Sequence, residues 1–138
     1  MKEPGQVIEE YIQLLESQNI EYYNRQGLYI LIPLKNTDHT FTQLIPPVTG
    51  KSYYCLSDYA GNFYTGVRIA RRAAKTMQMK YPEFKIWEDK YTSFEIDIEQ
   101  RFRFTSVKNI HKRVLRMAEV IDDCIQIGKD IAGDAFCR

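Results

Sequence analysis

Cationic residues recur at helical spacing in the middle of the chain, where their chemistry suits carboxylates or phosphates. Steps of three, four and seven residues place them on one side of a helix. They are Arg68, Arg71, Arg72 and Lys75. No acidic residue lies between Asp58 and Glu83 in the sequence. We therefore predict a basic helix face that docks the acidic or mixed surface of a protein partner.

A second stretch without acidic residues lies between Glu99 and Glu119. It adds Lys112, Arg113 and Arg116 to the predicted partner site. Tyrosine and arginine are common anchors of protein interfaces, so Tyr59 and Tyr64, which precede the first basic segment, belong to the same prediction. The plain alternative is that these cations are only the solvated exteriors of helices.

The same cations could instead bind nucleic acid. Phosphate binding needs cations on one surface, and unpaired bases stack on aromatic rings such as those of Tyr53, Tyr59 and Tyr64. The sequence has no zinc-finger spacing, RNP motif or glycine-rich phosphate loop. Nucleic-acid binding is therefore the alternative function, and it predicts an affinity that falls steeply with salt.

Side chains suited to catalysis are few. The chain has two histidines, and the neighbours Asp38 and His39 are more typical of a solvated turn than of a general base. No nucleophile, base and acid converge in the sequence, so we predict no catalytic residues and no enzyme activity. A small hydrolase or nuclease is the least favoured hypothesis, because it needs a pocket that gathers His39, Asp58 or His111.

Carboxylates alternate along a predicted strand near the end of the sheet. Glu95, Asp97 and Glu99 share one face of that strand, and such a row could hold a hard cation with oxygen ligands. A cation site would also need carbonyl ligands from loops, whereas Arg101 and Arg103 continue the row as cross-strand partners. We therefore predict no bound metal and no cofactor.

Composition fixes the class of protein. A chain of 138 residues with 44% hydrophobic and 27% charged residues predicts one globular domain over 1–138. Lys plus Arg number 19 against 18 for Asp plus Glu, so any electrostatic function must be local. No apolar run approaches the length of a membrane span, and we expect a cytoplasmic protein with no membrane partner.

An odd number of cysteines without CxxC spacing favours reduced thiols; we expect burial for two and a free thiol for the last. The three are Cys55, Cys124 and Cys137.

Hydrophobic periodicity predicts the order of the elements. We expect helices over 4–18, from Asn62 or Thr65 to before Pro82, and from Thr105 or Ser106 to Ile131, with strands over 28–34, 40–45, 52–56 and 93–104. Ser57, Asp58 and Gly61 supply turn chemistry that should end the third strand. Gln100 interrupts the apolar row of the last strand, so 93–104 is either one strand or a hairpin that turns near Gln100.

The last helix carries an apolar seam in alternating steps of three and four, with a second apolar row beside it. The seam residues are Val107, Ile110, Val114, Met117, Ile121, Cys124 and Ile131. Because this apolar surface is wider than one sheet contact needs, we predict that the seam forms a homodimer interface.

The fold predicted from these elements is α+β. An antiparallel sheet of four or five strands packs with three helices in the order α-β-β-β-α-β-(β)-α, ending in a long C-terminal helix. The first and third helices should cover the apolar face of the sheet, with the second across an edge or end.

Two resemblances accompany this prediction. Residues 31–39, then Leu56-Ser57-Asp58 with Gly61 and a helix, resemble a small prokaryotic and phage domain family of unknown function, although Tyr59-Ala60 departs from its motif. The order of elements is similar to the small dimeric chaperones of type III secretion and to their sensory regulator relatives. These resemblances imply a binding or inhibitor protein of bacterial or mobile-element origin.

Overall fold

The computed structural model describes residues 3–25, 30–33, 41–48, 50–64, 66–89 and 94–137. Its helices are α1 (Pro4–Ser17), α2 (Val67–Lys80) and α3 (Val107–Ala132), and a 3-10 turn covers Gly133–Ala135. Its strands are β1 (Tyr23–Asn24), β2 (Ile30–Pro33), β3 (Phe41–Ile45), β4 (Tyr53–Phe63), β5 (Lys85–Asp89), β6 (Glu95–Arg103) and β7 (Phe136–Cys137). The predicted turn at Asp38 and His39, and the predicted cap Thr65, lie outside the described residues.

The strands form one antiparallel sheet in the order β1-β2-β3-β4-β6-β5. Five of them are longer strands, while β1 and β7 contain two residues each and extend the sheet at its margins. The predicted α+β class, the order α-β-β-β-α-β-β-α and the long C-terminal helix are confirmed.

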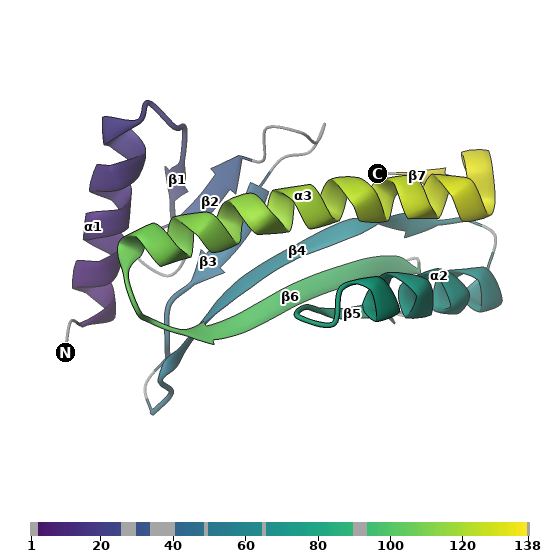
Figure 1. Ribbon diagram of the computed structural model, residues 1–138, viewed down its shortest axis with the longest axis horizontal. Helices are drawn as coiled ribbons and strands as arrows, with labels where there is room; N and C mark the ends of the chain where they lie inside the picture. The colour runs from purple at the N-terminus through teal and green to yellow at the C-terminus, as the bar shows by residue number, and fades with distance from the viewer. Residues whose placement is uncertain are drawn as a thin grey trace.

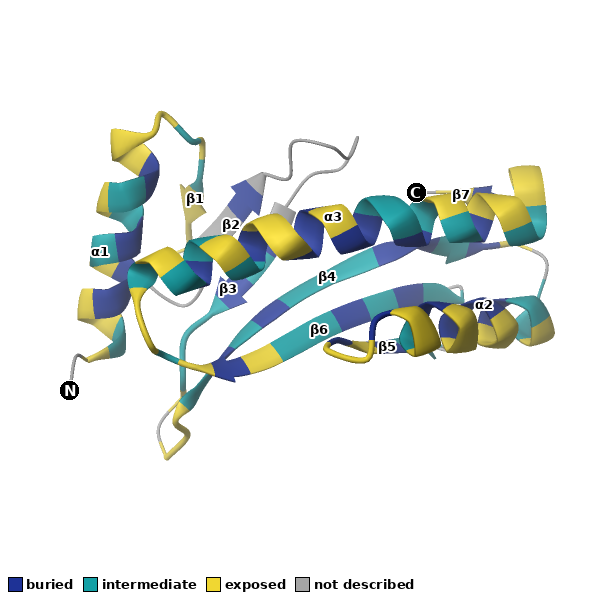
Figure 2. Ribbon diagram, in the orientation of Figure 1, coloured by how far each residue is buried: buried dark blue, intermediate teal, exposed yellow. Residues whose placement is uncertain are grey.

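The helices lie on one side of this sheet (Figure 1). α3 lies along β4, α2 packs on the edge strand β5, and α1 stands beside the N-terminal end of α3. Figure 2 shows that the buried side of α3 faces the strands and its exposed side faces away. Strand alternation explains the core, because Ile96, Ile98 and Phe102 of β6 are buried under the helices. The intervening residues of β6 face the opposite, helix-free side of the sheet.

β4 is longer than the sequence predicts. We expected the strand to end at Leu56, but it continues to Phe63 and pairs with β6 from Tyr53 to Asn62. The turn-forming residues are accommodated by a register shift between Tyr59 and Gly61, where Gly61 has a φ of 146°. Pairing with β6 therefore outweighs local turn preference, and α2 starts after Gly66 instead of near Asn62.

β6 is a single strand, and it pairs antiparallel with a strand that precedes it in the sequence. The partner strand β5 occupies 85–89, a segment to which the sequence analysis assigned no element. Gln100 does not turn the chain, because it pairs with Leu56 of β4 within the continuous strand. Its side chain accepts a hydrogen bond from Arg113 on α3 at 2.9 Å. Its amide also donates to the Glu83 carbonyl at 3.2 Å. The polar interruption of the apolar row is thus satisfied within the fold.

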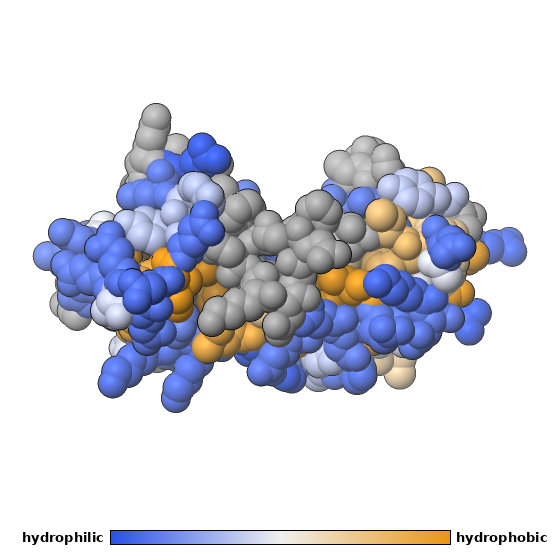
Figure 3. Space-filling view, turned by 90° about the horizontal axis from the view of Figure 1, so that it is seen from above, coloured by the Kyte–Doolittle hydropathy of each residue, from blue (hydrophilic) through white to orange (hydrophobic). Residues whose placement is uncertain are grey.

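The α3 seam faces the sheet of its own chain. Its fully or almost fully buried members are Ile110, Val114, Met117, Ile121 and Cys124. Leu115 of the second apolar row is 49% exposed, whereas Ala118 of that row is buried. In the view from above, patches of hydrophobic side chains show beside hydrophilic ones (Figure 3). The predicted homodimer through the seam is therefore not supported, since the sheet already occupies most of that surface.

The C-terminal strand fixes the end of β4 from which α2 departs. The ring of Phe136 lies 4.7 Å from that of Phe63, centroid to centroid, and is 4% exposed. The Tyr64 amide donates to the Ala135 carbonyl at 2.8 Å. Gly61 and Gly128 leave the space that this ring occupies. The C-terminal strand therefore fixes the end of β4, shortly before α2 begins.

Candidate functional site

α2 has two different sides. Small apolar residues pack one side closely against the rest of the fold, and the other side presents a basic surface. The buried side of the helix consists of Ala70, Ala73, Ala74 and Met77. On the other side Arg68, Arg72 and Lys75 are exposed, at positions i, i+4 and i+7. We call these three residues the basic face.

The fourth predicted cation of α2 is neutralised within the chain. Arg71 Nε lies 3.2 Å from a carboxylate oxygen of Glu88, whose side chain is 16% exposed. By contrast, the three residues of the basic face form no ion pair with any residue that the structure describes. Their positive charge is therefore directed to solvent.

The other cations predicted for the partner site differ in their surroundings. Lys112 is exposed on α3. Arg113 bonds Gln100, and its guanidinium carbon lies 4.7 Å from the Phe102 ring centroid, so this residue serves packing under the helix. Arg116 pairs with Glu83 at 3.1 Å and with Glu119 at 3.2 Å. Of this second group, Lys112 resembles the basic face, because it is exposed and forms no ion pair with any residue that the structure describes.

The tyrosines predicted as anchors are divided between two surfaces. Tyr64 is 67% exposed and lies three residues before α2. Tyr59 lies on the helix-free side of the sheet, among carboxylates. Tyr53 stacks under Arg101, whose guanidinium carbon is 5.1 Å from the ring centroid. The structure therefore brings Tyr64 near the start of the basic face and separates the other two rings from it.

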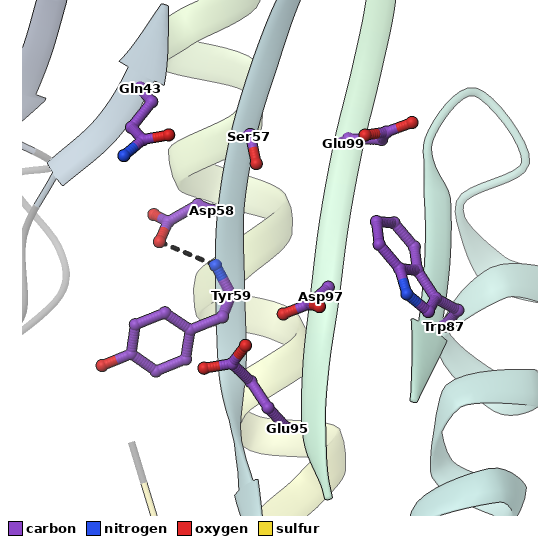
Figure 4. A pocket seen from close by; sticks show the side chains of 8 residues that line it. All are labelled: Gln43, Ser57, Asp58, Tyr59, Trp87, Glu95, Asp97 and Glu99. Carbon is purple, nitrogen blue, oxygen red and sulfur yellow. Dashed lines mark hydrogen bonds between the residues drawn. The ribbon is translucent and has the colours of Figure 1, made fainter. Parts of the chain in front are cut away.

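A hollow of about 510 Å³ opens on the helix-free side of the sheet. It forms because β3 pairs with β4 only as far as Gln43 and Ser57, while β4 continues beside β6 to Asn62. Its lining side chains come from β3, β4, β5 and β6 (Figure 4). They are Gln43, Ser57, Asp58, Tyr59, Trp87, Glu95, Asp97 and Glu99. We call this feature the acidic hollow.

The carboxylates of the acidic hollow crowd one another. Burial, together with the neighbouring Glu95 and Asp89 carboxyl groups, raises the pKa of Asp97 to about 8. Asp89, Glu95 and Asp97 each offer an oxygen within 4.8 Å of the others, a spacing at which a hard cation could be bound. Asp58 accepts a hydrogen bond from the Tyr59 amide at 2.7 Å, at the point where β4 has left β3.

The sequence pattern located part of this hollow. Alternation placed Glu95, Asp97 and Glu99 on one face, as the structure shows. Trp87 was missed because no strand was assigned to 85–89, and Asp58 was interpreted as a turn residue. The signal that could have found Trp87 is the short alternation of Phe84 and Ile86, both buried, with the polar residues around them.

Comparison with solved structures finds a similarity that extends over most of the chain. The crystal structure of YbjN from E. coli, a candidate transcription regulator, superposes with a TM-score of 0.66 at 10% identity. The match covers 89% of this chain and 90% of that chain. The fold is shared with YbjN. No protein-family model and no curated protein matches the sequence.

This likeness agrees with the regulator-like topology expected from the order of elements, and at 10% identity it speaks to fold alone. The resemblance to the prokaryotic and phage domain family receives no such support. No helix within the described residues is long and apolar enough to cross a membrane.

The groups considered for catalysis are not gathered in the described part of the chain. His111 lies on α3, where its Nδ1 is 3.1 Å from the hydroxyl of Tyr11, while Asp58 lines the acidic hollow. His39 lies outside the described residues. The described residues that line the hollow include no imidazole and no thiol.

The thiols agree with the expected burial pattern. Cys124 is fully buried, and burial raises the pKa of its thiol to about 12. Cys55 is half-buried, and burial and the Glu99 carboxylate raise its pKa. Cys137 is exposed. The two thiols of the sheet and α3 are thus held in the protonated, unreactive form.

Proposed function

We propose that this chain is a non-catalytic binding protein that docks the acidic or mixed surface of a macromolecular partner through its basic face. The observation that carries this proposal is the contrast among its cations. Arg71, Lys80 and Arg116 are tied to carboxylates, whereas Arg68, Arg72 and Lys75 point to solvent with no ion pair to a described residue. A small domain can place cations almost anywhere on its surface. Three unpaired cations along one side of a single helix therefore favour a docking role.

A protein partner is favoured over nucleic acid. Base stacking needs exposed rings next to the cations. Tyr64 meets that condition, but Tyr59 lies on the other side of the sheet and Tyr53 already stacks under Arg101. YbjN, which shares the fold, is a candidate transcription regulator, and that description fits a binding protein of either kind.

The test compares a glutamate-rich peptide with short DNA as fluorescent probes at low salt. We expect the peptide to bind the wild-type chain and the variant Arg68→Glu/Arg72→Glu to weaken this binding by about tenfold or more, because two attractions become repulsions. The matched control is Lys51→Glu/Arg103→Glu, which reverses two exposed cations at the other end of β4 and β6. We expect this control to change the affinity by less than about twofold.

Three outcomes would contradict the proposal. Equal loss in both variants would show that only net charge matters. Failure of the peptide to bind would remove the acidic partner. Tighter binding of DNA, with a steep salt dependence and loss in Arg68→Glu/Arg72→Glu, would establish the nucleic-acid alternative instead.

A further inference from the structure

The basic face continues into an exposed methionine at the C-terminal end of α2. Met79 is 83% exposed, the largest exposed fraction among the described large hydrophobic residues, whereas Met77 on the inner side of the same helix is fully buried. At about 100° per residue, the basic face and Met79 fall within a sector of about 60° on an ideal helix, and they span about 17 Å along its axis. We call these four residues, Arg68, Arg72, Lys75 and Met79, the α2 stripe.

The cations of the stripe do not serve the stability of α2 itself. The helix contains no acidic residue, so no carboxylate on α2 offsets their charge. Arg68 and Arg72 are four residues apart, a spacing at which like charges repel. Arg68 also lies in the first turn, where a cation opposes the helix dipole. A bound acidic partner would relieve these repulsions.

Met79 adds an apolar contact at one end of the stripe. A single exposed hydrophobic residue is ordinary in a soluble protein. Met79 differs because it extends the row of cations by one further helical step, four residues after Lys75. The flexible methionine side chain adapts to the shape of a partner, and the aliphatic stem of Lys75 can cover apolar surface beside it. The stripe therefore offers positive charge along most of its length and an apolar surface at its end.

The stripe lies at the margin of the helix layer. α2 packs against β5 and α3, and no other described helix lies beside it (Figure 1). Its buried residues all belong to the inner side, so the stripe faces away from the fold. A second helix can therefore lie along α2 without displacing any described element.

We propose that the α2 stripe binds an acidic helix of a protein partner, with carboxylates over the three cations and an apolar side chain against Met79. This inference rests on the proposed function and specifies the conformation and chemistry of the segment that docks. Charge complementarity favours the acidic segment. The spacing favours a helix, because successive stripe residues rise by about 6, 4.5 and 6 Å, steps that a second helix reproduces. Residues on one face of an extended strand are about 6.6 Å apart and would fall out of register.

The test uses alanine-based helical peptides that carry glutamates and one leucine on one side, at steps of four, three and four residues. This spacing reads the same from both ends, so the peptide is made with leucine first and with leucine last, and the tighter binder is used. In a matched isomer the leucine is moved by two residues to the opposite side of the helix. We expect the stripe peptide to bind about five- to tenfold more tightly than the isomer, because its leucine is buried against Met79.

Met79→Gln should bring the two peptides to within about twofold of each other. It should leave the affinity for a third peptide, with glutamine in place of leucine, unchanged. Methionine and glutamine have similar helix propensities and the position is exposed, so α2 should persist. The matched control is Val48→Gln, a 63% exposed residue that precedes β4, whereas α2 follows β4. This control should keep the preference for the stripe peptide.

The outcomes separate this inference from the proposed function. If the glutamine peptide binds through the basic face but the stripe peptide and its isomer bind equally, the helix register is wrong and the proposed function stands. A preference that survives Met79→Gln would also overturn the inference. Proline at the centre of the stripe peptide breaks its helix and should abolish the preference, and an unchanged preference would show that the docked segment is not a helix. If no glutamate-bearing peptide binds, or if short DNA binds more tightly than all of them, the proposed function fails as well.

Discussion

Phe136→Ala is expected to lower the free energy of unfolding by about 3 to 5 kcal/mol, the usual range for removal of a buried phenylalanine. The ring is 4% exposed and fills the space between Phe63, Gly61 and Gly128. Its loss leaves a cavity where β7 meets β4 and α3. Urea unfolding followed by circular dichroism measures the change.

The glycines around this ring give the prediction a sharper form. A Cβ on Gly128 would lie 2.7 Å from Phe136 ring atoms, so Gly128→Ala should destabilise the wild-type chain by about 1 to 3 kcal/mol. In the Phe136→Ala background the obstruction is gone, and the same substitution should stabilise by up to about 1 kcal/mol, because alanine favours helix over glycine. The effect of one substitution therefore changes sign with the background.

Gly61 serves as the matched control. A Cβ there would lie 2.4 Å from the same ring, but its φ of 146° also disfavours any side chain. Gly61→Ala should therefore destabilise in both backgrounds. If Gly128→Ala had equal effects with and without the Phe136 ring, the packing of the C-terminal strand against α3 would be incorrect.

Asp97→Asn is expected to stabilise the chain in alkaline solution. The pKa of this carboxyl is raised from 3.8 to about 8, so between these pH values the folded chain binds more protons at Asp97 than the unfolded chain does. The free energy of unfolding contributed by this group therefore falls as pH rises from about 4 to 8. Allowing for the partial exposure of the side chain, we expect a gain of about 1 to 3 kcal/mol for the variant at about pH 9.

The pH dependence distinguishes this effect from simple repacking. At about pH 4 Asp97 is protonated in the folded chain and resembles asparagine, so the variant should match the wild type there. Glu9→Gln, on the exposed side of α1, should change stability by less than about 0.5 kcal/mol at both pH values. An equal gain at pH 4 and pH 9, or no gain at pH 9, would contradict the crowding of carboxylates in the hollow.

Local periodicity predicted the elements whose pattern is strong. Pro4 and the i, i+3, i+4 spacing located α1, and the strict alternation after Phe94 located β6. Pairing between strands that are distant in the sequence determined the other elements. Ser57 and Asp58 favour a turn, yet pairing with β6 holds them in a strand. Where β3 no longer pairs with β4, the Tyr59 amide donates a hydrogen bond to the Asp58 carboxylate.

The site could be predicted only where one element carries it. The basic face lies on one helix, so spacing alone brings Arg68, Arg72 and Lys75 together. The acidic hollow draws on four strands, and its position depends on where β3 separates from β4, which no local pattern specifies. The α3 seam shows the same limit, because periodicity shows that a helix face is buried, but not whether its own sheet or a second copy buries it.

The most direct test of the central claim is an amide chemical-shift titration of the isotope-labelled chain with the glutamate-rich peptide. If the chain docks acidic partners through its basic face, the largest shifts should gather on α2 around Arg68, Arg72 and Lys75 and leave β5 and β6 unchanged. Shifts scattered over all exposed cations, Lys51 and Arg103 included, would contradict the account.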